Sequence, residues 1–153
     1  MAQRRGRYTV VLDNPPSIRA AATVGCKKES EGPLGGMFDI INKDSYFGQA
    51  SWEKAESQMQ SLAVSKALEK AGLQNTDIDF IFAGDLLNQC IGSTYGLREL
   101  GIPYVGLFGA CSTMAESLCV ASTFIEGGVA QKVVACTSSH FCTAERQFRF
   151  PLE

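Results

Sequence analysis

Cys111 is the residue whose surroundings in the sequence favour chemistry most clearly. It follows an apolar segment, residues 103–108, and begins an expected helix that runs to about Glu126. A thiol at a helix start meets free backbone N–H groups and the positive end of the helix dipole, which favour the thiolate. The same pattern also fits a buried cysteine that begins an ordinary core helix, because free cysteine is often buried. The segment therefore predicts a nucleophile or an anion-binding point, and a packing role stays open.

Hydroxyl groups directly follow this cysteine. Ser112 and Thr113 stand where their side-chain oxygens can accept hydrogen bonds from the free N–H groups of the first helical turn. We therefore expect them to cap the helix that begins at Cys111.

Other polar side chains share with Cys111 a position just after an expected strand. The full set of candidate ligand-binding residues is Asp85, Cys111, Ser138, Ser139 and His140. Because the carboxyl ends of parallel strands meet at one edge of a sheet, we expect these side chains to line one crevice. A thiol, an imidazole and a carboxylate can act there as nucleophile, base and orienting group. They can equally form a polar binding pocket without catalysis.

Each of these residues also has an ordinary structural interpretation. Asp85 follows Gly84 and can cap the next segment, and His140 can be a satisfied loop histidine. Ser138 and Ser139 can cap a following turn. Among the five, Cys111 has the strongest functional pattern.

Composition narrows the possible partners. The 153 residues suit one domain with 45% hydrophobic and 20% charged residues, and the formal net charge is −2. Arg4, Arg5 and Arg7 cluster near the start, but we expect a solvated tail and no nucleic-acid partner. The six cysteines include no C-x-x-C pair and His140 is the single histidine, so we predict no metal site, no cofactor and reduced thiols.

No segment has the pattern of a secretory signal or of a membrane span. The basic start runs into a short apolar stretch and then Pro15 and Pro16, and no run approaches about 18 apolar residues. We expect a cytoplasmic protein, and peripheral docking on a membrane stays open.

The elements that must position these residues alternate in type. Helical periodicity over residues 51–71 predicts a long helix, with Ser51 as N-cap and Gly72 as C-cap. Its expected core face consists of Ala55, Met59, Leu62, Ala63 and Ala67.

The remaining expected elements are strands and helices on either side of this helix. The strands span residues 7–13, 18–24, 78–83, 103–108 and 131–137, and the other helices span residues 87–100 and 111–126. The irregular stretch 26–36 is expected to be a surface loop. This order predicts an α/β fold with a parallel or mixed sheet covered by helices.

The motifs at the expected strand ends resemble a known superfamily. The segments GIPYVGLFGACSTMAESL (residues 101–118), GDLLNQC (84–90) and TSSHF (137–141) are similar to those of thiolases and ketoacyl synthases. Within that superfamily the whole chain, including DSYFGQASWEKAESQM (44–59), most resembles the stage V sporulation protein AD family of spore-forming bacteria. The resemblance implies a thiolase-like fold, with residues 1–153 forming the N-terminal half of a duplicated α/β/α fold.

The same resemblance implies a function. It suggests binding of dipicolinic acid (pyridine-2,6-dicarboxylate) and support of its uptake into the developing spore, without catalysis. It also suggests membrane-embedded partners from the same operon, a position peripheral to the spore inner membrane, and a homodimer through residues 103–108. Calcium stays open as a companion of the ligand, because it prefers carboxylate oxygens such as those of Asp85. The alternative is an acyl-transfer enzyme, in which Cys111 would occupy the position of the nucleophile.

Overall fold

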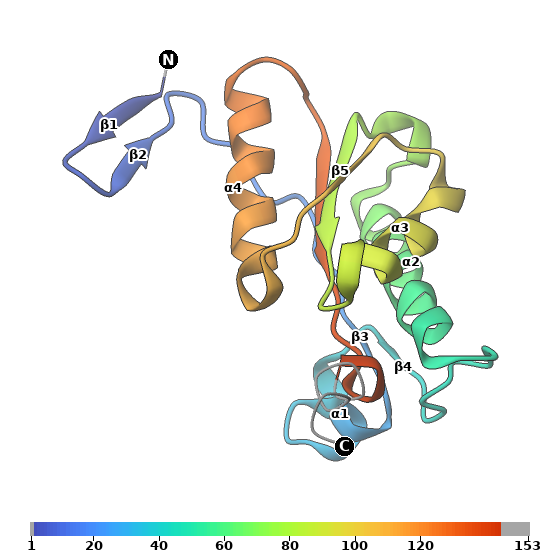
Figure 1. Cartoon of the computed structure of the whole chain (residues 1–153). Coiled ribbons are helices and arrows are strands. Elements are labelled where there is room, and N and C mark those ends of the chain that lie inside the picture. Colours follow the sequence, from blue (N-terminus) through green and yellow to red (C-terminus); the bar gives the residue numbers. More distant parts are fainter. Residues whose placement is uncertain (1, 145–153) are drawn as a thin grey trace.

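A three-stranded parallel sheet lies at the centre of the molecule (Figure 1). The computed structural model describes residues 2–144. The central strands are β5 (Phe80–Gly84), β6 (Tyr104–Gly106) and β7 (Val133–Thr137). β5 lies between the other two, with Ala83 opposite Gly106 and Gly84 opposite Thr137. The three strands therefore end at the same edge, as the sequence predicts.

Helices cover both faces of this sheet (Figure 1). α4 (Thr113–Glu126) packs on one face, and α2 (Trp52–Ala71) and α3 (Ile91–Leu97) pack on the other. Side chains of β5 alternate accordingly, because Ile81 belongs to the core beneath α2 and α3 whereas Phe82 belongs to the core beneath α4. The predicted α/β class is confirmed.

α2 has the predicted ends. The Ser51 hydroxyl accepts the N–H of Lys54 at 3.3 Å, and Gly72 adopts a left-handed conformation at φ 67° that ends the helix. The predicted core face is partly wrong. Ala55 and Met59 are buried, but the remaining buried positions are Glu56, Gln60, Val64 and Leu68, whereas Leu62, Ala63 and Ala67 are partly exposed. The buried face is turned because α3 packs along α2.

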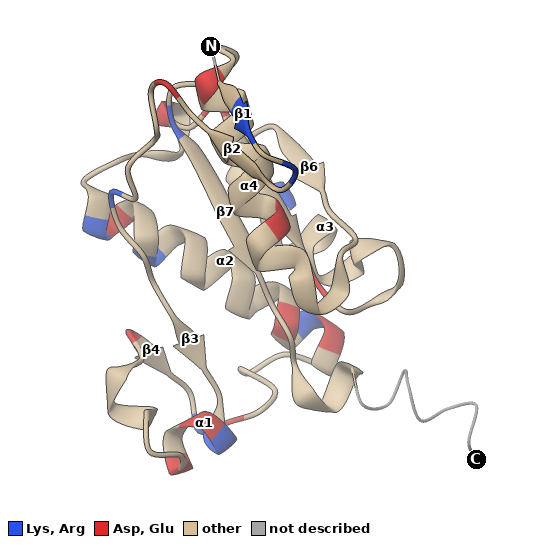
Figure 2. Ribbon diagram, turned by 90° about the vertical axis from the view of Figure 1, so that its left-hand side faces the viewer, with Lys and Arg blue, Asp and Glu red and all other residues tan. Residues whose placement is uncertain are grey.

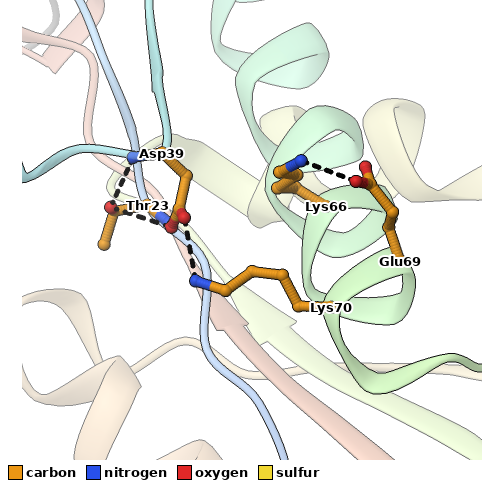
Figure 3. Close-up of polar contacts among 5 residues, drawn as sticks. All are labelled: Thr23, Asp39, Lys66, Glu69 and Lys70. Carbon is orange, nitrogen blue, oxygen red and sulfur yellow. Dashed lines mark hydrogen bonds and ion pairs between the residues drawn. The ribbon is translucent and has the colours of Figure 1, made fainter.

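The C-terminal end of α2 is tied to the N-terminal third of the chain (Figure 3). Lys70 Nζ lies 2.8 Å from Asp39 Oδ1, and the other oxygen of Asp39 accepts the N–H of Thr23 at 2.9 Å. The hydrogen bond from Lys70, followed by that from Thr23, lowers the pKa of Asp39. Lys66 pairs with Glu69 on the same helix.

The N-terminal third differs from the expected pair of strands. β1 (Gln3–Arg5) and β2 (Thr9–Val11) form an exposed antiparallel hairpin that stands away from the body in Figure 1 and lies in front of α4 in the view of Figure 2. Of residues 18–24, only the last contributes to a strand, β3 (Val24–Gly25), which pairs with β4 (Ile40–Ile41). The predicted strands at 7–13 and 18–24 are therefore too long, because few of their backbone groups find a partner strand.

Short helices replace two of the predicted elements. α1 (Lys27–Glu31) lies in the stretch expected to be a loop, where the Glu29 carboxylate accepts the N–H of Cys26 at 3.0 Å in a capping box. The 3-10 helices are η1 (Gly35–Met37), η2 (Asn75–Asp77), η3 (Asn88–Cys90), η4 (Arg98–Leu100) and η5 (Ala110–Ser112). The predicted helix over 87–100 is thus divided into η3, α3 and η4. Within residues 2–144, no helix is long and apolar enough to cross a bilayer.

Candidate functional site

Asp85 lies directly after β5 and is 1% exposed. Its Oδ1 accepts the N–H of Leu87 at 2.8 Å, and its Oδ2 accepts the N–H and the hydroxyl of Ser93 at 2.7 and 2.6 Å. These bonds fasten the end of β5 to the following loop and to α3. The sequence leaves several roles open for Asp85. Its contacts match a structural role, in which Asp85 holds the loop after β5.

Ser138 connects the end of β7 to α2. Its hydroxyl accepts a hydrogen bond from Gln60 Nε2 at 2.7 Å and donates one to Glu56 Oε1 at 2.7 Å. The same Gln60 nitrogen lies 2.9 Å from the Ser93 hydroxyl, which donates to Asp85. Two predicted site residues, Asp85 and Ser138, thus belong to one continuous buried network.

His140 and Ser139 lie beside this network. His140 is 3% exposed, its Nε2 lies 2.7 Å from the carbonyl oxygen of Ser45, and its Nδ1 is buried without a partner. Ser139 is exposed. Both residues line a small cavity with Cys26 and Cys142.

Cys111 is exposed and lies in η5, the single 3-10 turn that precedes α4. The predicted hydroxyl caps are wrong. The Ser112 hydroxyl donates to the carbonyl oxygen of Gly109 at 2.7 Å, and the Thr113 hydroxyl is buried without a partner. Ser112 is inside a tight turn, where that carbonyl is the nearer partner. Neither η5 nor α4 begins with a side-chain cap. The N–H groups of Ser112 and Thr113 already donate to the carbonyl oxygens of Gly109 and Ala110, so the N–H groups left without a capping side chain are those at the start of η5.

Backbone strain gathers at the same edge of the sheet. Ala110, which precedes Cys111, has φ 48°, and Gln89 and Cys90 in the loop after β5 have φ 60° and 53°. Such left-handed conformations are unfavourable for residues other than glycine and cluster at functional sites. Strain therefore marks two of the three loops that carry candidate residues, the one after β5 and the one before α4.

The five predicted residues share an edge but form two groups. Asp85, Ser138 and His140 lie on the side of the sheet covered by α2 and α3, where their partners are Gln60, Glu56 and Ser45. Cys111 belongs to η5, which leads directly into α4 on the other face of the sheet (Figure 1). No hydrogen bond joins Cys111 to the buried network within residues 2–144, so the predicted single crevice is not formed by direct contact.

Sequence reasoning missed the centre of the network. Glu56 and Gln60 are each 1% exposed, and Ser93 is fully buried. Burial, opposed by the hydrogen bond from Ser138 and reinforced by the charge of Asp85, raises the pKa of Glu56 to about 7. A signal for this was present, because Glu56 and Gln60 directly follow the apolar Ala55 and Met59 with the same spacing of four residues.

A further missed residue, Glu116, lies against the Cys111 turn. A β-carbon added at Gly109 would collide with Glu116 Oε2 and would lie 2.9 Å from the Ser112 hydroxyl. A larger residue at position 109 would therefore require the side chains of Glu116 and Ser112 to move aside. Glu116 Oε2 is buried without a partner, so an acidic group faces the turn from the first part of α4.

No metal cluster is apparent in the part of the chain that the structure describes. Residues 2–144 contain no group of three or more His, Cys, Asp or Glu side chains arranged to hold a metal ion. Both oxygens of Asp85 already accept hydrogen bonds from protein donors.

Comparison with known proteins identifies a family to which this chain is similar. A family model described as Stage V sporulation protein AD matches residues 6–153. The chain is 47% identical over 148 residues to Stage V sporulation protein AD of Bacillus subtilis (strain 168), covering 97% of the chain and 44% of that protein. It therefore spans less than half the length of this curated relative.

Solved structures of synthases have the same fold. The 3-oxoacyl-[acyl-carrier-protein] synthase III of Aquifex aeolicus is 23% identical, with a TM-score of 0.52 over 57% of this chain and 30% of the synthase. The corresponding synthase of Xanthomonas oryzae is 20% identical, with a TM-score of 0.53 over 78% of this chain and 42% of the synthase. At these identities the likeness shows the thiolase-like fold alone.

Proposed function

Because this chain belongs to the stage V sporulation protein AD family, we propose that it binds dipicolinic acid and supports its uptake into the developing spore, without catalysis. The 47% identity over nearly the whole chain assigns it to a family of sporulation proteins with a synthase-like fold. The proposal of dipicolinate binding goes beyond membership of this family. It is supported by the uncapped helix start at Cys111.

A flat dicarboxylate requires N–H donors for its oxygens and apolar surface for its ring. The uncapped start of η5, which leads directly into α4, offers N–H groups and the positive end of a helix dipole. Exposed apolar side chains stand on either side of Cys111, namely Phe108 (65% exposed) and Met114 (42% exposed). We place one carboxylate of the ligand at the turn, with the ring against these two side chains.

The remaining predicted residues have indirect roles in this proposal. Asp85 and Ser138 are engaged in the buried network and shape the edge of the sheet. Ser139 is exposed and is a candidate for direct contact. The chemistry proposed here does not depend on calcium as a companion of the ligand.

Calorimetric titration of the intact protein with dipicolinate tests the proposal. We expect binding by the unchanged protein and at least tenfold weaker binding by the variant Met114→Asp, which adds a charge beside the turn and removes apolar surface. Val129→Asp, an exposed apolar position after the far end of α4, is the matched control and should bind normally. Absence of binding by the unchanged intact protein would refute the proposal.

An acyl-transfer enzyme is the second candidate, favoured by one observation. The exposed Cys111 thiol follows Ala110, whose strained backbone resembles the tight turns on which nucleophiles are presented. Incubation with several acyl-CoA donors, followed by mass spectrometry, would reveal an acyl adduct that Cys111→Ala abolishes. An unmodified mass with every donor argues against this candidate.

The wider context of the family supplies the proposed location and partners. We propose a cytoplasmic position peripheral to the spore inner membrane, beside the membrane-embedded proteins of the same operon. We also propose that a second thiolase-like half completes the fold. Co-purification with the membrane proteins, with and without Met114→Asp, separates a ligand-dependent role from that of an assembly platform.

A further inference from the structure

Two cysteine thiols, those of Cys26 and Cys142, line one small cavity. Cys26 stands directly before α1, and Cys142 lies in the segment that follows β7, so the two residues are far apart in the sequence. Both residues are partly exposed, which leaves their thiols accessible to small molecules. Folding of the chain therefore brings two accessible thiols to the same place.

A contact beside the cavity joins the two segments that carry these cysteines. Lys28, two residues after Cys26, places its Nζ 3.4 Å from the ring centroid of Phe141. Phe141 directly precedes Cys142, and a cation over an aromatic face is an attractive contact. A disulfide requires the two backbones to approach within about 7 Å. A contact between the immediate neighbours of the two cysteines favours such an approach.

The thiol of Cys26 lies close enough to Cys142 to be influenced by its charge. Burial, followed by the charges of Glu29 and Cys142, raises the pKa of Cys26 to about 11. The Sγ of Cys26 contacts the Sδ of Met59 at 3.6 Å. Since sulfur makes only weak hydrogen bonds, the thiol can give up this contact and turn toward Cys142.

The remaining four cysteines occupy different places in the fold. Cys90 and Cys136 are buried, whereas Cys111 and Cys119 are exposed, the first just before α4 and the second within it. None of these four lines the cavity. The cavity therefore brings together one particular pair of thiols.

We propose that Cys26 and Cys142 are a redox modification site, which forms a disulfide when it meets a low-molecular-weight disulfide. The new bond joins the segment after β7 covalently to the start of α1. That segment begins with Ser138, Ser139 and His140, so oxidation holds these candidate site residues in place, and reduction leaves them with noncovalent contacts alone. The inference does not rest on dipicolinate binding, because it depends only on the cavity and its two thiols.

Thiol–disulfide exchange accounts for every atom and electron of this step. Near neutral pH the Cys26 thiol keeps its proton, because its pKa is about 11, so we assign the first attack to Cys142. The Cys142 thiolate, after releasing its proton to water, bonds to one sulfur of the oxidant and displaces one thiolate. Cys26 then loses its proton to water, and its sulfur attacks that of Cys142 and displaces the second thiolate. The two protein sulfurs lose two electrons in all, and the oxidant gains them as two thiols.

Peptide mapping of the intact protein tests the inference. The protein is incubated with glutathione disulfide and glutathione in increasing ratio, its free thiols are blocked, and it is digested without reduction. We expect a joined pair of peptides that contain Cys26 and Cys142, which is two hydrogens lighter than the separate reduced peptides and separates on reduction with dithiothreitol. Absence of this pair at every ratio, or a larger yield of any other pairing, overturns the inference.

Single serine variants distinguish the roles of the two thiols. In Cys26→Ser, exchange should stop at a glutathione adduct on Cys142, because the thiol that displaces glutathione is missing. Cys119→Ser removes an exposed cysteine of α4 as the matched control, and the joined pair should form as in the unchanged protein. A glutathione adduct on Cys142 that accumulates in the unchanged protein and the control, in place of the joined pair, would show that the two thiols do not meet and overturns the inference.

Amide hydrogen exchange on the unchanged protein measures whether the bond holds the segment. The N–H groups of Thr143 and Ala144 donate to the carbonyl oxygen of His140, so they report on its structure. We expect them to exchange at least about tenfold more slowly after oxidation, and at the earlier rate after reduction. The N–H of Ile81, which donates to Pro103 in the central sheet, should exchange at the same rate in both states. A joined pair of peptides with unchanged exchange at Thr143 and Ala144 would refute the holding role.

Discussion

Asp85 is a buried carboxyl group with a structural role, although its position at the end of a strand suggests a functional one. Every donor to its carboxylate comes from Leu87 or Ser93, both within eight residues in the sequence. These three bonds satisfy both carboxyl oxygens in a nearly inaccessible position. The loop after β5 is therefore closed by its own first residue.

Replacing this carboxylate should weaken the fold. In Asp85→Asn, one amide orientation places an NH₂ group against the N–H of Leu87 and the other places it against the N–H of Ser93. We expect a loss of about 2–3 kcal/mol in the free energy of unfolding, because a buried donor is left unpaired. Urea denaturation measures it, and the exposed Glu31→Gln should lie within about 0.5 kcal/mol of the unchanged protein. Equal stability of both variants would contradict the structural role.

At the scale of elements, the packing of α2 on α3 decides which face of α2 is buried. Gly96 allows this approach, because a β-carbon there would lie within 3 Å of the backbone of Ser57. The close contact turns Glu56 and Gln60 inward, where they meet the end of β7. A glycine within α3 thus determines the position of polar residues on another helix.

The variant Gly96→Ala should separate the two helices. Since the colliding atoms belong to backbone, they cannot move aside like the end of a flexible side chain. We expect a destabilisation of at least about 2 kcal/mol, despite the higher helix propensity of alanine. Gly36→Ala is the matched control, because an added β-carbon there meets nothing within 4 Å. Thermal unfolding that leaves Gly96→Ala unchanged would contradict the close packing.

At the scale of the whole molecule, one face of α4 remains apolar and exposed. Met114 and Leu118 are 42% and 40% exposed, and Cys111 and Cys119 are exposed beside them. The chain spans 44% of the length of its Bacillus subtilis relative. We expect the second thiolase-like half that we propose above to cover this face, because apolar patches of this kind mark interfaces.

The unpaired side of β6, at the edge of the central sheet, is a surface through which we expect the protein to self-associate. β6 pairs with β5 on one side, and no strand within residues 2–144 pairs with its other side. We expect the intact protein without ligand to be a dimer through this edge by light scattering. Phe108→Asp, at the exposed end of this segment, should shift the mass toward that of a monomer, whereas Tyr8→Asp on the distant hairpin should not. A monomeric unchanged protein would refute the dimer.

Local patterns by themselves determined the α/β class, the bounds of α2 and the position of all five candidate residues at one edge. They could do so because helix caps, periodicity and the alternation of strands and helices act over short stretches of chain.

Only the tertiary structure decided which of these residues meet. Ser138 bonds to Glu56 across 82 positions in the sequence, and Gln60 bonds to Ser93 across 33. No local pattern encodes such pairs, because they exist only once α2, α3 and β7 are packed together. The same packing divides the predicted crevice, leaving Cys111 exposed beside α4 and burying Asp85 and His140 on the opposite side of the sheet.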